Sequence, residues 1–172
     1  MSLAHWQSNE RLAKRAIEDR GFIVHDANVL FGANCPNIDL VIYGQQRAVY
    51  VQVKSSQKPA GSDHVIIDGS PWTSDQLHAS APIFNRHNHF CCSHVVIVDT
   101  LKTGETEFYV APPEPLEALL RKSAREFAAR PKRDGTLRSI RFRKELPRSS
   151  LKEWRRAWSL LGIPLHAVTT ND

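Results

Sequence analysis

The chain has 172 residues, of which 41% are hydrophobic and 24% are charged, a composition typical of one soluble domain with a full core. No apolar stretch reaches the roughly 18 residues of a membrane-spanning helix. The first 20 residues lack the apolar segment of a signal peptide, and the spacing of the three cysteines is not that of a disulfide framework. These features exclude secreted, membrane, fibrous and repeat classes, and we expect a protein of the reducing cytoplasm.

The order of predicted elements is that of a mixed α/β domain. Hydrophobic periodicity and turn signals predict these elements. They are a helix at 3–20, strands at 22–29, 38–43 and 48–55, a loop at 57–72, a helix at 73–84, strands at 94–99 and 105–111, a helix at 115–130, a strand at 137–144 and a helix at 149–161. We expect a single domain over 1–172, in which 1–111 form the core and 112–172 a basic helical C-terminal extension.

A cluster of polar side chains is predicted on the hairpin formed by the second and third strands. If Gly44 pairs with Arg47 across the short turn, counting back along both strands places Asp39 opposite Gln52. Lys54 lies two residues beyond Gln52 and therefore shares its face. A one-residue bulge would break this register. The alternative interpretation is an exposed sheet face that carries ordinary surface residues.

Glu10 is a carboxylate on the apolar side of the first helix. It lies four residues after Trp6, three before Ala13 and seven before Ile17, which is helical spacing. An unpaired charge there would be unfavourable, so the carboxylate needs a partner. A cation held near Asp39 would provide one.

These residue types suit phosphodiester cleavage. Glu10, Asp39 and Gln52 offer the hard oxygen ligands that Mg²⁺ or Mn²⁺ prefers. A bound metal would polarise the phosphate and lower the pKa of a bound water. Lys54 could orient that water and stabilise the developing negative charge.

At these residues the sequence resembles the PD-(D/E)XK nuclease superfamily, which includes restriction endonucleases and Holliday-junction resolvases. Asp39 matches the first motif acid, Gln52-Val53-Lys54 matches the second motif, and Glu10 matches the helix-borne acid of many members. The resemblance covers about the first 100 residues. It implies a restriction endonuclease-like αβββαβ core with a mixed central sheet, here with extra C-terminal helices. Two departures are Ile38 in place of proline and Gln52 in place of the acid, although Mrr-like restriction enzymes are similar in carrying Gln-x-Lys.

The net charge of +5 is unevenly distributed. Residues 1–120 contain 9 basic and 13 acidic residues, 121–148 contain 11 and 3, and 149–172 contain 3 and 2. The middle segment could hold a phosphate backbone, or its arginines could pair with acids of 1–120 and stabilise the domain. The residues expected to contact nucleic acid are Lys132, Arg133, Arg138, Arg141, Arg143 and Lys144.

A rival site is the run of zinc-type ligands His87, His89, Cys91, Cys92 and His94. Its spacing lacks paired CxxC motifs, and the ordinary alternative is a polar loop that leads into a strand.

The favoured function is a Mg²⁺-dependent endonuclease acting on DNA in restriction, repair or recombination. Alternatives are a catalytically silent nuclease-fold module that binds nucleic acid or a protein, and a scaffold partner in a defence or toxin system. By analogy with nucleases that cut both strands, a homodimer is a candidate assembly.

Overall fold

The computed structural model describes residues 3–32, 35–56, 62–86, 90–101, 103–136 and 143–165. Within these ranges, no helix combines the length and the apolar character needed to cross a membrane.

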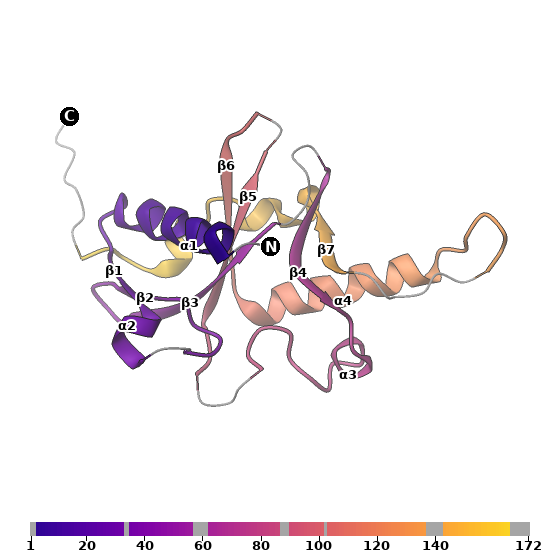
Figure 1. Ribbon diagram of the computed structural model, residues 1–172, viewed down its shortest axis with the longest axis horizontal. Helices are drawn as coiled ribbons and strands as arrows, with labels where there is room; N and C mark the ends of the chain where they lie inside the picture. Colours follow the sequence, from indigo (N-terminus) through magenta and orange to yellow (C-terminus); the bar gives the residue numbers. More distant parts are fainter. Residues whose placement is uncertain are drawn as a thin grey trace.

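A five-stranded mixed sheet forms the centre of the described structure (Figure 1). Its strands are β1 (Ile23–Asp26), β2 (Leu40–Tyr43), β3 (Ala48–Ser55), β5 (His94–Thr100) and β6 (Thr106–Ala111). Their spatial order is β1-β2-β3-β5-β6, with β3 and β5 parallel and every other neighbouring pair antiparallel. The expected α/β class with a mixed central sheet is confirmed.

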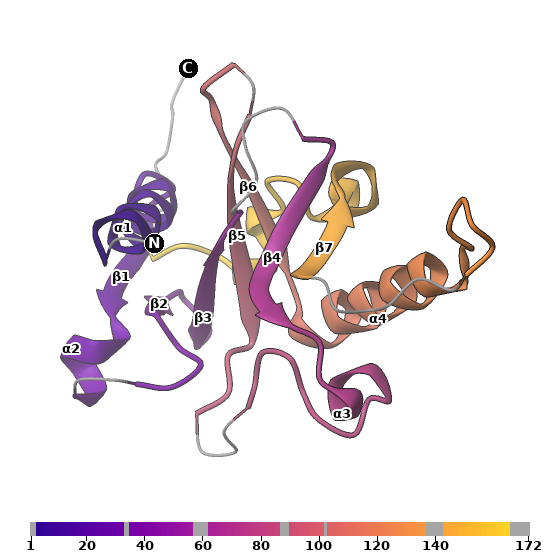
Figure 2. The ribbon, with the colours of Figure 1, turned by 45° about the vertical axis from the view of Figure 1, so that its right-hand side comes forward.

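The two faces of the sheet are covered by different elements, as Figure 2 shows. Helix α1 (Leu3–Glu18) packs on one face, where Ala13 and Ile17 are completely buried. The other face carries helix α4 (Pro113–Ala129) and a two-stranded sheet of β4 (His64–Pro71) and β7 (Arg143–Pro147). These layers produce two apolar clusters, one on each side of the central sheet.

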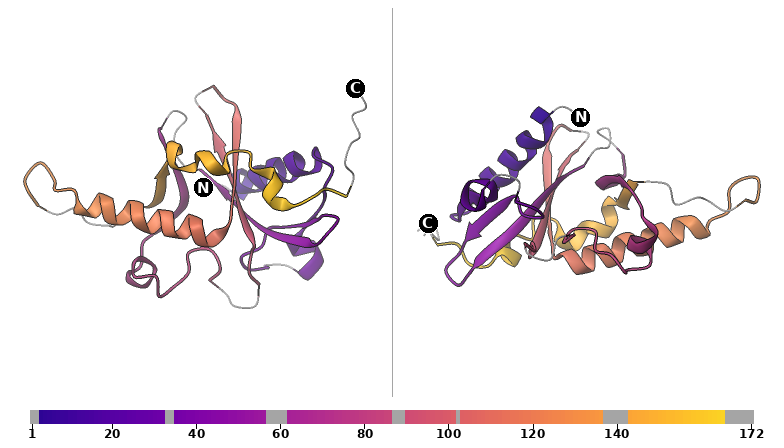
Figure 3. Two further views of the ribbon diagram at one scale, coloured as in Figure 1. Left: turned by 180° about the vertical axis from the view of Figure 1, so that it is seen from behind. Right: turned by 60° about the horizontal axis from the view of Figure 1, so that its bottom comes forward.

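The C-terminal segment belongs to both clusters. It forms two short 3₁₀ helices, η1 (Arg148–Trp154) and η2 (Trp158–Leu161). Leu151 and Trp154 pack in the cluster beneath α4, whereas Trp158 and Leu161 pack in the cluster beneath α1. Figure 3 shows this segment crossing the back of the sheet from β7 toward the β2–β3 hairpin. The extension is therefore part of the core rather than an appendage.

Several predicted elements were wrong in type or length. The stretch 57–72 contains strand β4, because it pairs with the distant β7. The strand expected at 22–29 ends at Asp26 and continues as helix α2 (Ala27–Phe31). The helix expected at 73–84 is limited to α3 (Ser74–Leu77), after which Ala79 has a left-handed backbone with φ of 62°.

The helix expected at 149–161 is interrupted by Arg156, whose φ of 50° is incompatible with a continuous right-handed helix. The result is η1 and η2 in place of one α-helix. In the strand expected at 137–144, residues 137–142 lie outside the described ranges, and β7 begins at Arg143.

Candidate active site

The predicted hairpin register is confirmed from Leu40 to the turn. Leu40 pairs with Val51, and the remaining pairs continue in step to the turn, where the N–H of Gly44 donates to the carbonyl of Arg47 at 3.2 Å. The expected pairing of Asp39 with Gln52 does not continue this register, because Asp39 precedes β2 and lies against Val51, the partner of Leu40.

Asp39 is anchored on β3 through its backbone and its side chain. Its N–H donates to the carbonyl of Val51 at 2.8 Å, and its Oδ2 accepts the N–H of Val53 at 2.6 Å. Its own carbonyl accepts the N–H of Ala27 at 2.9 Å, which connects it to the start of α2. These three hydrogen bonds fix the carboxylate beside β3.

The regular alternation of the strand breaks at Asp39. Ile38 packs in the cluster on the α4 side, whereas Leu40 packs in the cluster on the α1 side. In an uninterrupted strand these two residues would share a face. The strand predicted at 38–43 is therefore interrupted at Asp39, and β2 begins at Leu40. The change of direction leaves the Asp39 carboxyl within reach of α1.

Glu10 of α1 makes that contact. Its carboxyl donates a hydrogen bond to the carboxylate of Asp39. Burial, the charge of Asp39 and that of Asp26 raise the pKa of Glu10 to about 8, while Lys54 acts in the opposite direction. Burial also raises the pKa of Asp39, opposed by the Val53 N–H, by Lys54 and by the Glu10 hydrogen bond. Two carboxyl groups thus share one proton at the end of the hairpin.

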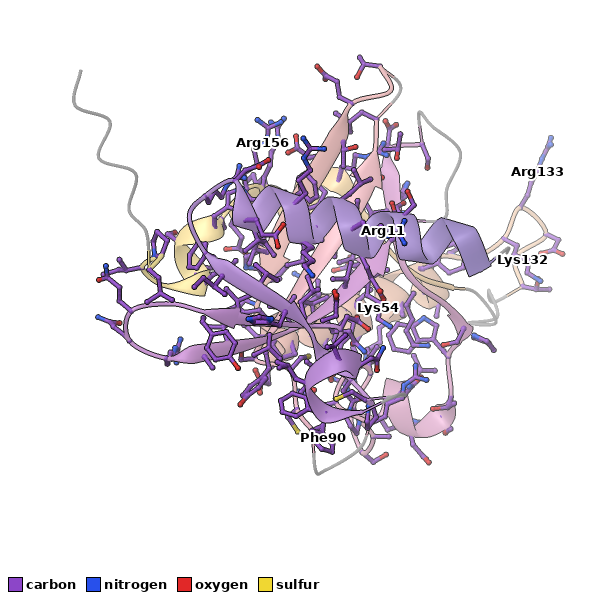
Figure 4. The ribbon with its side chains drawn as sticks, turned by 60° about the vertical axis from the view of Figure 1, so that its left-hand side comes forward. Arg11, Lys54, Phe90, Lys132, Arg133 and Arg156 are labelled. Carbon is purple, nitrogen blue, oxygen red and sulfur yellow. The ribbon has the colours of Figure 1, made fainter. Side chains whose placement is uncertain are left out.

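The remaining two predicted residues lie on β3. Lys54 is partly buried (Figure 4), and its charge acts on both carboxyl groups. The Oε1 atom of Gln52 is buried and accepts no hydrogen bond from any described residue. The structure therefore brings Glu10, Asp39 and Lys54 together, with an unpaired amide oxygen on the same strand as the lysine.

Three further residues border this site and were not identified as such from the sequence. Asp26 contributes to the raised pKa of Glu10 and forms an ion pair with Lys14 at 3.0 Å. Burial and the charge of Asp39 raise the pKa of the Cys35 thiol, and raise that of Cys92 to about 12. Asp26 pairs with Leu40 across β1 and β2, so the register of that strand pair would have located it. Cys35 lies four residues before Asp39 in the chain, whereas no sequence signal places Cys92 near Asp39.

The alternative zinc site is only partly within the described residues, because His87 and His89 lie outside them. Cys91 is exposed, whereas Cys92 and His94 are buried. Among the described residues, no group of three or more His, Cys, Asp or Glu side chains is arranged to hold a metal ion.

Lys144 does not lie where a phosphate contact requires it. Its side chain is completely buried, and its ammonium group donates to the carbonyl and hydroxyl oxygens of Ser70 and to the carbonyl of Pro71, at 2.9 to 3.2 Å. Lys144 shares the inward face of β7 with Leu146, which is also fully buried. The expectation of an outward-facing Lys144 was wrong.

Other basic residues of 121–148 also serve the fold. Arg148 binds the buried carboxylate of Asp99 at 2.6 and 3.1 Å, and Arg121 pairs with Glu117 at 2.8 Å. Arg121 and Arg148 therefore follow the alternative prediction, in which arginines of 121–148 pair with acidic residues of 1–120 and stabilise the domain.

Lys132 and Arg133 are exposed at the tip of a projecting arm formed by α4 and the turn that follows it (Figures 1 and 4). The turn is closed by hydrogen bonds between Lys132 and Thr136 and between Gly135 and Lys132, at 2.8 and 2.9 Å. Arg138 and Arg141 lie outside the described residues, and the side chain of Arg143 is not described.

Comparison with known proteins gives a distant structural similarity. No protein-family model and no curated protein matches the chain. A solved structure of a bacterial homing endonuclease, I-Ssp6803I, aligns with a TM-score of 0.47 and 21% identity, over 90% of this chain and 86% of the other. At these values the similarity is too distant to assign a function, which we infer from the side chains of the site instead.

Proposed function

We propose that this protein is a metal-dependent nuclease that hydrolyses phosphodiester bonds of DNA, with Glu10, Asp39, Gln52 and Lys54 as its active site. The observation that carries the proposal is the hydrogen-bonded carboxyl pair of Glu10 and Asp39 beside Lys54. Three segments far apart in the sequence converge there. The pattern is that of the Gln-x-Lys variant of the PD-(D/E)XK nucleases.

The donor set fits Mg²⁺ or Mn²⁺. Glu10 and Asp39 supply two carboxyl groups, and the buried Oε1 of Gln52 has no hydrogen-bond donor among the described residues. Hard divalent cations of this kind prefer such oxygens together with water and substrate phosphate. When bound, the ion would polarise the scissile phosphate and lower the pKa of a bound water.

The residues of the chain have separate tasks in this scheme. The Val53 N–H donates to Oδ2 of Asp39 and holds the carboxylate in place. Glu10 would carry the shared proton in the metal-free protein. The pair would hold a cation only after Glu10 had released that proton to solvent. Lys54 places a positive charge beside both carboxyl groups, where it can stabilise the charge that develops on the phosphate.

The projecting arm would bind DNA away from the cleavage site. Lys132 and Arg133 are exposed there, Lys122 and Arg125 are exposed on α4, and Arg130 is exposed just after its end. Such contacts to phosphates position a duplex without reading its sequence. We also assign Arg138, Arg141 and Arg143 to this interface, because they belong to the same basic segment.

A module that binds nucleic acid without cutting it is the second candidate. The observation that favours it is Gln52, because an amide at this position removes one negative charge from the metal site.

Incubation of supercoiled plasmid with the purified protein tests the proposal. We expect cleavage in Mg²⁺ or Mn²⁺, none in EDTA, and none by Asp39→Ala, because that variant loses both a metal ligand and the partner of Glu10. Metal binding by the two proteins should be compared by calorimetry. Plasmid binding without cleavage in either metal would instead support the silent module.

A further inference from the structure

Two consecutive arginines are exposed along β6, the edge strand of the central sheet. Arg155 forms an isolated antiparallel bridge with Tyr109, and the N–H of Arg156 donates to the carbonyl of Phe108 at 2.9 Å. Their backbone is therefore fixed on the sheet, although their side chains remain 57% and 60% exposed. Both arginines lie outside the basic segment 121–148, and the proposed function gives them no task.

A buried carboxylate orients both guanidinium groups. Glu107, whose side chain is 1% exposed, accepts the Nε–H of Arg155 and the Nε–H of Arg156, each at 2.7 Å. One arginine is enough to neutralise a buried carboxylate. The second guanidinium therefore adds a net positive charge, and the Nη atoms of Arg156 have no hydrogen-bond partner among the described residues.

Arg20 brings a third cation to the same place. Its guanidinium carbon lies 4.4 Å from the centre of the Trp158 ring, just beyond the end of α1. Burial lowers the pKa of Arg20, the charge of Asp19 raises it, and the charge of Arg156 lowers it. Arg20 and Arg156 are thus close enough to repel each other, and an anion held by both would relieve that repulsion. We call Arg20, Arg155 and Arg156 the arginine cluster.

The backbone of Arg156 is left-handed, with φ of 50°. This conformation is unfavourable for a residue that has a Cβ atom, whereas glycine adopts it readily. Backbone strain of this kind is concentrated at functional sites, where the surrounding structure holds a side chain in a required position. The strain therefore favours a role for the Arg156 guanidinium beyond the neutralisation of Glu107.

We propose that the arginine cluster binds phosphate groups in the backbone of a DNA duplex. Guanidinium groups form paired hydrogen bonds with phosphate oxygens, and a guanidinium already oriented by a carboxylate loses little freedom on binding. The proposal rests on the proposed nuclease function, to which it adds a second contact surface.

The cluster lies within reach of a duplex that occupies the active site. Glu18, the last residue of α1, lies eight residues after Glu10, which is about 12 Å at 1.5 Å per residue. The major groove of DNA has a similar width of about 12 Å. Figure 4 shows Arg156 on one side of Lys54 and the arm on the other. A duplex would therefore be held on both sides of the bond that is cut.

Fluorescence anisotropy of a labelled duplex in EDTA, at several salt concentrations, tests the cluster in the absence of cleavage. The variants are Arg20→Ala, Arg156→Gly and the double variant. Each single variant should lower the slope of log affinity against log salt concentration by roughly 0.9, and the double variant by roughly 1.8. Arg47→Ala, which removes an exposed arginine from the hairpin turn, is the matched control and should leave the slope unchanged.

The melting temperature separates DNA binding from a structural role. Arg156→Gly should stay near the wild-type value, because Arg155 still neutralises Glu107 and glycine accepts the left-handed backbone. Arg20→Ala should also fold normally, because Arg20 makes no contact with Glu107 among the described residues.

A double variant that binds the duplex with wild-type affinity and slope would overturn the inference. A lower melting temperature with an unchanged slope would also overturn it, since the arginines would then serve stability alone. If inorganic phosphate stabilises the wild type but not the double variant, while both bind the duplex equally, the site takes a small anion and not DNA.

Failure of the nuclease proposal is detected separately. If the cluster variants weaken duplex binding as expected but the wild type cuts no plasmid in Mg²⁺ or Mn²⁺, the phosphate site holds and only the nuclease assignment is contradicted. A wild type that does not bind the duplex at all contradicts both.

Discussion

Glu10 is a partly buried carboxyl group whose pKa lies far above its ordinary value. It lies one turn before the buried Ala13, and its carboxyl is held against that of Asp39. Such a pair is stable in the absence of a cation only while one of the two groups is protonated. The site therefore couples the protonation of Glu10 both to folding and to metal binding.

The stability of the metal-free protein should depend on pH through Glu10. Its pKa is about 8 in the folded chain, against an ordinary value of 4.5. The protonated carboxyl therefore favours the folded state fully below pH 4.5, and this contribution is lost as the pH rises through 8. In EDTA, the melting temperature of the wild type relative to Glu10→Gln should fall over this range. A difference that does not change with pH would contradict the shared proton.

A second prediction at this scale concerns Gln52. The Gln52→Glu substitution restores the acid of the family pattern next to the carboxyl pair, so the affinity for Mn²⁺ should rise by about tenfold, or about 1.4 kcal/mol. Isothermal titration calorimetry measures this directly. Gln46→Glu, which adds the same charge at an exposed position of the hairpin turn, is the matched control and should leave the affinity unchanged. Equal or weaker binding by Gln52→Glu would remove Gln52 from the ligand set.

At the scale of elements, the C-terminal residues 163–164 form backbone contacts with the turn of the hairpin that carries Gln52 and Lys54. Gly44 forms an isolated bridge with Pro164, and the N–H of Gln45 donates to the carbonyl of Ile163 at 3.0 Å. The contact is close because residue 44 has no side chain. A Cβ atom there would lie 2.7 Å from the carbonyl oxygen of Ile163.

Gly44→Ala should therefore displace this segment and lower the free energy of unfolding by about 1–3 kcal/mol. Urea denaturation gives the value, and Gln45→Ala, an exposed neighbour, should have little effect. Full stability of Gly44→Ala would mean that the segment does not pack on the hairpin in solution.

The hairpin and its register could be predicted because all of their determinants are local. The short turn and the alternation of Val49, Val51 and Val53 suffice to place Leu40 opposite Val51. The position of Asp39 does not follow from this register, because its N–H donates to the carbonyl of Val51. Glu10 could likewise be recognised as a carboxylate on the apolar side of a helix. The hydrogen bond between Glu10 and Asp39 was not predictable, since it depends on the break in alternation at Asp39.

Strand β4 was missed because nothing near it in the sequence determines it. Its partner β7 lies more than 70 residues away, where His64 pairs with Pro147. The glycine and proline residues of 57–72 indicated a loop. Pro71, however, is the last residue of the strand, where the missing backbone N–H of proline is tolerated. Lys144 was misassigned for a related reason. Among neighbouring arginines it resembles a surface residue, yet the oxygens of Ser70 and Pro71 satisfy its ammonium group inside the protein.

At the scale of the whole molecule, the basic charge is divided between the interior and the arm. Arg121, Lys144 and Arg148 have internal partners, whereas Lys132 and Arg133 extend from the end of α4 (Figure 4). Removing charge from the entire segment would therefore destabilise the fold. Within 121–148, only substitutions on the arm can test DNA binding.

The double variant Lys132→Ala/Arg133→Ala should weaken duplex binding and flatten its dependence on salt. Each lost phosphate contact should lower the slope of log affinity against log salt concentration by roughly 0.9. Fluorescence anisotropy at several salt concentrations measures the slope, and an unchanged melting temperature verifies the fold. Lys152→Ala, an exposed lysine on η1, is the control. An unchanged slope in the double variant would exclude the arm from the interface.

The most direct test of the nuclease site is a comparison of plasmid cleavage and DNA binding by the wild type and Lys54→Ala in Mg²⁺. The lysine acts on the transition state more than on bound DNA, so we predict that Lys54→Ala abolishes cleavage and retains the affinity for DNA. Arg11→Ala, which removes an exposed cation from the neighbouring helix, is the matched control and should still cleave (Figure 4). Equal cleavage by the wild type and Lys54→Ala would contradict the assignment of the active site.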